Sequence, residues 1–170
     1  MRLSVLAVLC ALGALTPARA EVRLGPIEWQ EGVKAESRGA RFEPVRALSL
    51  AGGKAARRLR AKISLLNGGP NAVEGILLRY CFSARLVPRE GRSAGVWAVP
   101  FMIDEKRVPK LGAAKAQDVT LVPSLLASYL ERLARTGFIP DRLRLQVMLE
   151  PRAGESTPLQ NLESDLEVSR

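Results

Sequence analysis

Cationic side chains recur at alternate positions in two stretches of the chain, a spacing that could hold an anion. Arg58, Arg60 and Lys62 are two residues apart, and Arg79 and Arg85 repeat the pattern further along. Residues two apart on an extended strand point to the same face, and like charges on neighbouring strands repel one another. Three arrangements stay open: a solvated surface, ion pairs with carboxylates elsewhere in the chain, or an external anion such as an acidic surface polymer.

Cys81 is the second candidate for chemistry, because it falls on the same predicted face beside Arg79. In the simplest hairpin register, Arg58 lies nearly opposite this cysteine. A cationic setting lowers the pKa of a thiol and raises its reactivity. The sequence therefore allows either a reactive free thiol or a small, inert residue covered by another segment.

The chain lacks the residues that most other catalytic mechanisms require. The chain contains no histidine, which excludes Ser-His-Asp and Cys-His catalysis and every histidine-based zinc site. Its two cysteines, Cys10 and Cys81, are too few for a four-cysteine zinc or iron–sulfur site. Phosphate-binding, dinucleotide-binding and EF-hand motifs are also missing from the sequence. We therefore predict a non-enzymatic protein without a cofactor or a metal site.

Four carboxylates, Glu74, Asp104, Glu105 and Asp141, are candidates for the pair that glycoside hydrolysis needs. Asp104 and Glu105 are neighbours in a predicted turn, where adjacent side chains point apart, and Asp141 follows a proline. Aromatic residues make up only 5% of the chain, which argues against a cleft that stacks on sugars. A structural role is favoured for all four, and a carboxylate-dependent hydrolase is kept as an alternative.

Alternation of apolar and polar residues marks the strands that must position these side chains. Three long strands are predicted at residues 58–65, 76–87 and 141–150. Shorter strands are predicted at residues 45–50, 107–111 and 117–122. The segment 95–103 is also β-rich but contains Pro100, which cannot donate to a ladder. It is therefore predicted to break there or to lie at a sheet edge.

A turn and a helix connect these strands. Asn67-Gly68-Gly69-Pro70-Asn71 has the composition of a turn, so the strands on either side are predicted to pair as an antiparallel hairpin. Between residues 124 and 137 the apolar period becomes that of a helix, with Ser124 as its N-cap and Gly137 as its C′ residue. The apolar stripe of this helix consists of Leu125, Leu126, Tyr129, Leu130 and Leu133.

This order of elements predicts a mostly β fold, an immunoglobulin-like antiparallel β-sandwich with one helix inserted before the last strand. The stretch ISLLNGGPNAVEGILLRY resembles the strand–Asn-x-Gly–strand hairpin of bacterial adhesion-type and fibronectin-like sandwich modules. The resemblance implies an architecture and no activity. The predicted regions are a signal peptide at 1–20, an irregular lead-in at 21–44, the β-sandwich at 45–150 and a flexible acidic tail at 151–170.

The first twenty residues, MRLSVLAVLCALGALTPARA, have the order of a secretory signal peptide. Arg2 precedes an apolar stretch that is shorter than the roughly 20 residues of a membrane span. Ala18-Arg19-Ala20 then has the small-x-small pattern of a cleavage site. We predict cleavage after Ala20, export to the periplasm or the medium, and no transmembrane segment in the remaining chain.

The predicted function is that of an exported, non-enzymatic module that acts by protein–protein contact in the bacterial envelope or outside the cell. Pro100 indicates an exposed edge, and edge strands can recruit a strand from a partner. The alternative is an anion- or glycan-binding module that uses the basic face, since the chain carries a formal net charge of +9. Nucleic acid is not a predicted partner, because the compartment is wrong and no aromatic platform accompanies the basic face.

Overall fold

The computed structural model describes residues 22–34, 40–50, 58–90, 94–150 and 158–169, so the predicted signal peptide and its cleavage site lie outside it. The described part is mostly β, with one short helix. In chain order its elements are β1 (Val22–Lys34), β2 (Ala40–Pro44), β3 (Ala47–Ser49), β4 (Leu59–Asn67), β5 (Val73–Pro88), β6 (Val96–Trp97), β7 (Met102–Leu111), β8 (Ala116–Leu121), α1 (Leu126–Leu133), β9 (Phe138–Leu149) and β10 (Gln160–Ser169).

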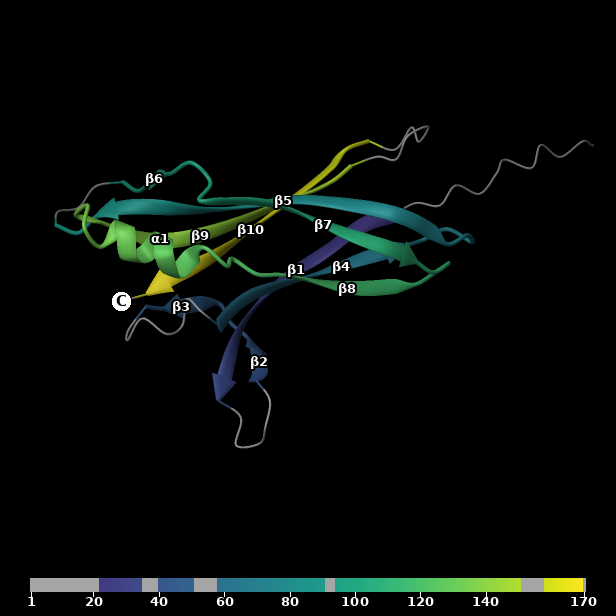
Figure 1. Cartoon of the computed structure of the whole chain (residues 1–170), viewed down its shortest axis with the longest axis horizontal. Helices are drawn as coiled ribbons and strands as arrows, with labels where there is room; N and C mark the ends of the chain where they lie inside the picture. The colour runs from purple at the N-terminus through teal and green to yellow at the C-terminus, as the bar shows by residue number, and fades with distance from the viewer. Residues whose placement is uncertain (1–21, 35–39, 51–57, 91–93, 151–157, 170) are drawn as a thin grey trace, which may run out of the picture.

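The strands form two sheets that pack face to face, as Figure 1 shows. The four-stranded sheet has the order β2-β1-β4-β8. The six-stranded sheet has the order β3-β10-β9-β5, and β6 and β7 follow one another along the outer edge of β5. Neighbouring strands are antiparallel, except that β3 runs parallel to β10. The predicted β-sandwich architecture therefore holds at this level.

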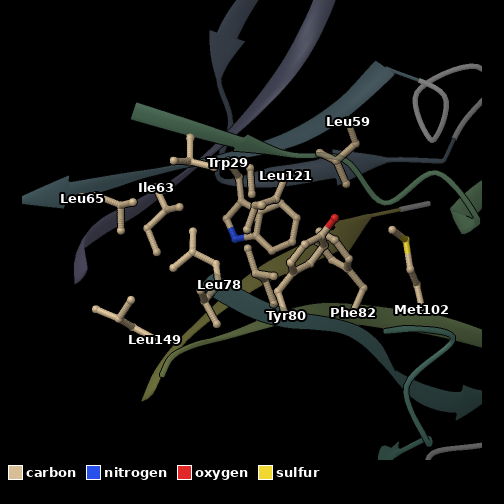
Figure 2. Packing of buried hydrophobic residues seen from close by; sticks show 14 of the residues in the cluster. Trp29, Leu59, Ile63, Leu65, Leu78, Tyr80, Phe82, Met102, Leu121 and Leu149 are labelled. Atoms are coloured by element: carbon tan, nitrogen blue, oxygen red, sulfur yellow. The ribbon is translucent and has the colours of Figure 1, made fainter. Parts of the chain in front are cut away.

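The hydrophobic core lies between the two sheets and is built from alternate residues of the long strands (Figure 2). Six of its side chains that are at most 2% exposed are Leu59, Ile63 and Leu65 of β4, Leu78 and Phe82 of β5, and Leu145 of β9. Trp29 of β1 and Tyr80 both pack against the Phe82 ring, with centroids 5.9 Å from it. The alternation predicted for these three strands is confirmed.

The turn at residues 67–71 joins the two sheets, so the predicted hairpin is wrong. β4 pairs with β1 and β8, whereas β5 pairs with β6, β7 and β9. Asn67, which is 3% exposed, donates through Nδ2 to the carbonyl oxygens of Asn71 at 2.8 Å and Gly112 at 2.9 Å. Its Oδ1 accepts from the Gly69 N–H at 3.0 Å. The asparagine thereby ties this connection to the one between β7 and β8.

Two segments that were predicted to be largely irregular, the first with one short strand at residues 22–29, are strands in the structure. β1 fills much of the predicted lead-in at 21–44, and its ladder with β4 shifts register between Leu24 and Ile27, where Gly25 and Pro26 lie. β10 falls in the predicted flexible tail at 151–170, yet it pairs with both β9 and β3 and buries Leu166, which is 1% exposed. The lead-in and tail assignments are therefore wrong where the structure describes these segments.

The helix α1 is shorter than predicted and connects β8 of one sheet to β9 of the other. Its N-cap residue is Leu125, with no side-chain cap, and not Ser124. The C-cap is Ala134, so Gly137 lies three residues beyond it and the predicted C′ assignment is wrong, although Gly137 does have a φ of +75°. Because β10 follows β9, the helix does not directly precede the last strand. None of the described helical residues forms a span long and apolar enough to cross a membrane.

Candidate functional site

The five cations predicted to share one face lie on two different sheets. Arg60 and Lys62 alternate with buried residues on β4 and so lie on the outer face of the four-stranded sheet. Arg79 and Arg85 do the same on β5 and lie on the outer face of the six-stranded sheet. These two faces point away from each other, since the core lies between the sheets. The prediction of a single basic face is wrong, because it assumed that β4 and β5 pair.

On the outer face of the four-stranded sheet, the cations have partners within the chain. Arg60 donates through Nε to Gln30 Oε1 at 2.8 Å, and its guanidinium lies 3.6 Å from the centroid of the Phe42 ring. Lys62 Nζ lies 3.4 Å from Asp118 Oδ2 and 3.7 Å from a Glu28 carboxylate oxygen. Arg58 lies just before β4 and is exposed.

The cations of β5 also have partners. Arg79 Nη1 lies 2.6 Å from Glu150 Oε1. Arg85 donates to both carboxylate oxygens of Asp141, at 2.9 and 2.5 Å. The Arg85 hydrogen bonds hold the pKa of Asp141 below its ordinary value. Of the three arrangements left open by the sequence, these contacts match pairing within the chain.

The four candidate carboxylates are not gathered into one site. Asp104 and Glu105 lie within β7 and not in a turn. Asp104 Oδ2 accepts a hydrogen bond from the Tyr80 hydroxyl at 3.0 Å, and this bond adds to burial in raising the pKa of Tyr80 to about 12. Glu105 pairs with Arg107 at 3.3 Å, and Glu74 pairs with Lys110 at 3.2 Å. Within the described ranges, no three acidic or cysteine side chains are grouped closely enough to hold a metal ion.

Cys81 lies half-buried on the outer face of the six-stranded sheet. Its Sγ donates to Gln146 Oε1 at 3.3 Å. Burial, and then the negative charge of Glu163, raise the pKa of the Cys81 thiol above its ordinary value. Because β4 belongs to the other sheet, Arg58 is not opposite Cys81, and the premise for a lowered pKa is wrong.

The outer edge of β5 provides a different candidate. β6 and β7 both pair with this edge, through Arg85–Trp97 and Phe82–Met102. Between these two pairs β5 has two residues, whereas the edge has four, residues 98–101. The Ala98 N–H donates to the Ala84 oxygen and the Phe101 N–H to the Phe82 oxygen, both at 2.9 Å. The chain therefore bulges at Val99 and Pro100, and the predicted strand break at an edge is confirmed.

Large apolar side chains point into solvent along this edge, which we call the β6–β7 edge (residues 96–103). Val96 is 71% exposed, Val99 is 83% exposed and Ile103 is 76% exposed. Among the described residues, these are the three most exposed large hydrophobic side chains. Ile103 also borders a shallow hollow of about 330 Å³ on the sheet face, which Cys81 and Met148 line as well. The sequence indicated this edge through the segment GVWAVPFMI, which is an apolar run interrupted by a proline.

Aromatic side chains on the same segment hold the edge in place. The Phe101 ring stacks on Tyr129 of α1, with centroids 4.6 Å apart, and also lies 6.4 Å from Phe82. The Trp97 ring lies 4.0 Å from the guanidinium carbon of Arg144. Arg144 is itself fixed by two hydrogen bonds to Asp165 of β10, at 2.8 and 3.1 Å. The edge is thus anchored on both faces of the sheet, while its most exposed side chains remain available.

Comparisons with known proteins assign no family to this chain. No protein-family model matches it, and no curated protein sequence matches significantly. A β-glucosidase from Erythrobacter marinus is 14% identical, with a TM-score of 0.41 over 88% of this chain and 16% of that one. The β-D-glucoside glucohydrolase of Trichoderma reesei is 12% identical, with a TM-score of 0.44 over 88% of this chain and 19% of its own. TM-scores this low carry no argument about fold or activity.

Proposed function

We propose that this chain is an exported, non-enzymatic β-sandwich module that binds another protein through the β6–β7 edge, in the bacterial envelope or outside the cell. The single observation that carries the proposal is the exposure of Val96, Val99 and Ile103, at 71, 83 and 76%, along a free sheet edge. An exposed sheet edge that carries apolar side chains is a template on which a strand of another chain can pair. The partner we propose is an extended segment of another protein.

The chemistry of such binding follows from the edge itself. A free edge offers unpaired backbone N–H and C=O groups, to which an extended segment can add as a further strand. Burying an aliphatic side chain of this size contributes about 1.5–3 kcal/mol. The anchored edge loses little freedom on binding, which lowers the entropic cost. Mixed charges on β7, including Asp104 and Lys106, and the bulge at Pro100 discourage indiscriminate pairing of exposed edges.

The strand order supports an immunoglobulin-like assignment of this sandwich. In immunoglobulin-type domains, strands A, B and E adjoin in one sheet, and strands G, F and C adjoin in the other, with a further strand C′ beside C. Here the three-strand run β1-β4-β8 faces the run β10-β9-β5-β7. Assigning these strands in chain order as A, B, C, C′, E, F and G reproduces that arrangement. Modules of this architecture commonly serve as binding domains on cell surfaces, which agrees with the predicted signal peptide.

A site-specific cross-linking experiment tests the proposed edge. The full chain is expressed in its own cells with the photoreactive amino acid p-benzoylphenylalanine in place of Val99, and irradiated. Val99 is 83% exposed, so the replacement leaves the fold intact. The matched control carries the same group at Leu159, which is 52% exposed and lies before β10, away from the edge. We expect a discrete protein adduct from position 99 and none from position 159.

The adduct must also depend on the edge. Ile103→Lys, introduced together with the photoreactive group at position 99, places a charge where the partner strand would lie and should abolish the adduct. An adduct that forms equally at both positions, or that survives Ile103→Lys, would contradict the proposal. Polysaccharide or lipid in place of protein would favour the anion- or glycan-binding alternative instead.

A further inference from the structure

A second hollow lies between α1 and the beginning of β9, away from the β6–β7 edge. Its volume is about 420 Å³, which is within the range of small-molecule sites. Most of the described residues that line it are apolar, including Leu130 and Leu133 of α1 and Phe138 and Ile139 of β9, and the charged ones are Arg89 and Glu131. The hollow is therefore suited to an apolar group.

The hollow exists because α1 covers this end of the sandwich incompletely. Within the helix only Leu126 and Leu133 are buried, and Leu130 is half-buried. Ala127 and Ala134 leave space beside Leu130, because their side chains end at Cβ. Phe138, at the beginning of β9, is 44% exposed on the opposite side. An apolar chain could therefore lie between the helix and the strand and remove both faces from water.

Arg89 places a positive charge at this hollow. Its backbone N–H donates to the Gly137 oxygen at 2.8 Å, which fixes it beside the turn that leads into β9. Its side chain is exposed, and no carboxylate in the described ranges forms an ion pair with it. Glu131 is the other charged side chain among the described lining residues, and it has an interaction of its own. The exposed Arg89 guanidinium can therefore bind an anionic group next to the apolar lining.

We propose that this hollow binds a single-chain amphiphile, with its apolar tail against Leu130 and Phe138 and its anionic head on Arg89. A carboxylate and a phosphate head are both acceptors for a guanidinium, so a fatty acid and a lipid phosphate share the required chemistry. None of the described residues that line the hollow belongs to the β6–β7 edge.

Titration of the full chain with dodecanoate and with dodecyl phosphate, followed by calorimetry below their micellar concentrations, tests the proposal. We expect saturable binding of one molecule per chain, and the tighter of the two probes identifies the preferred head group. Arg89→Ala should weaken binding about tenfold, since a hydrogen bond to a charged group contributes roughly 1.4 kcal/mol or more. Arg107→Ala removes the same charge from the exposed surface of β7 and should leave binding unchanged.

Two further arms separate a built site from general adsorption. Ala134→Trp places an indole in the hollow from an exposed position and should abolish binding, with an unchanged circular dichroism spectrum. Dodecyltrimethylammonium, which has the same tail and the opposite charge, should bind at least about tenfold more weakly. Equal affinity for the cationic probe, unchanged binding in Arg89→Ala or Ala134→Trp, or no saturable binding at all would overturn the inference. Ala127→Phe serves as the second blocking variant if Ala134→Trp does not fold.

Discussion

Single charged side chains on the outer faces are engaged mainly with one another. Arg144 illustrates this, because it contacts Asp165, Glu163 and the Trp97 ring at once. An exposed ion pair contributes only about 0–1 kcal/mol, so these contacts add little to the free energy of unfolding individually. These contacts instead fix the positions of the strands. Arg144 of β9 holds Asp165 of β10 on one side and the Trp97 ring of β6 on the other.

Cys81 should react slowly with thiol reagents in the native protein. Its raised pKa leaves less thiolate at neutral pH, and the side chain is half-buried. Iodoacetamide labelling at a series of pH values, with the Cys81 peptide quantified by mass spectrometry, should give a midpoint above that of the urea-unfolded chain. The native rate should be well below the unfolded rate throughout.

Glu163→Gln supplies the control for this prediction. Removing the carboxylate removes one of the causes that raise the Cys81 pKa, so the labelling midpoint should move to lower pH. Glu167→Gln removes the same charge from β10 at a site that is not among those causes, and should leave the midpoint in place. A native midpoint below that of the unfolded chain would restore the reactive-thiol interpretation.

At the scale of elements, alternation identified the strands that contribute one face to the core. Residues of β4, β5 and β9 alternate because each strand is buried on one side only, and this requirement is written locally in the sequence. Alternation does not specify which strands pair with one another in a sheet. Thus the turn beginning at Asn67 was compatible with a hairpin, although its two strands cover the core from opposite sheets.

The full β1 and β10 strands lacked a clear local pattern for separate reasons. In β1, the register shift at Gly25-Pro26 interrupts the alternation, and the two residues are themselves typical of turns. In β10, acidic residues occupy the outward positions, and such residues are depleted in strands. They are accommodated because Asp165 lies opposite Arg144 and Glu167 lies opposite Arg142 on β9. The arginines that balance these acidic residues are distant in the sequence, so the segment considered alone was predicted to be a flexible tail.

Leu166→Ala tests whether β10 is part of the folded core. Leu166 is 1% exposed, and truncating a buried leucine to alanine costs about 2–5 kcal/mol because it removes apolar contact and leaves a cavity. Leu159→Ala is the matched control, since Leu159 is 52% exposed and an exposed site should change stability by no more than about 0.5 kcal/mol. Urea unfolding measures both variants. Equal, small effects would mean that the segment is a dispensable tail.

At the scale of the whole molecule, the described strands leave sheet edges at β2, at β8, at β3 and along β6 and β7. The β6–β7 edge combines the greatest apolar exposure with a proline at its bulge. The sequence predicted an edge there from Pro100 alone. It could not indicate which side chains point outward, because GVWAVPFMI is apolar almost throughout and alternation carries no information in such a run.

Pro100 and the bulge are expected to prevent the β6–β7 edges of two molecules from pairing. Pro100→Val should therefore allow the protein to self-associate through this edge. Proline cannot donate a backbone hydrogen bond, and the bulge interrupts the ladder that a second edge would need. Valine restores the donor and favours extended backbone, so the exposed Val96, Val99 and Ile103 become part of a continuous template for pairing. Sedimentation velocity over a range of concentrations should show self-association in this variant and not in the parent chain.

The same experiment identifies the edge responsible. Adding Ile103→Lys to Pro100→Val should restore concentration-independent sedimentation, because a charged side chain on the pairing edge disfavours association. Pro158→Val, at an exposed position before β10, should remain like the parent. If Pro100→Val also behaves like the parent, the charges of β7 are sufficient to guard the edge. The proline then serves to shape the bulge that presents Val99 to a partner, and protection against self-pairing is not its role.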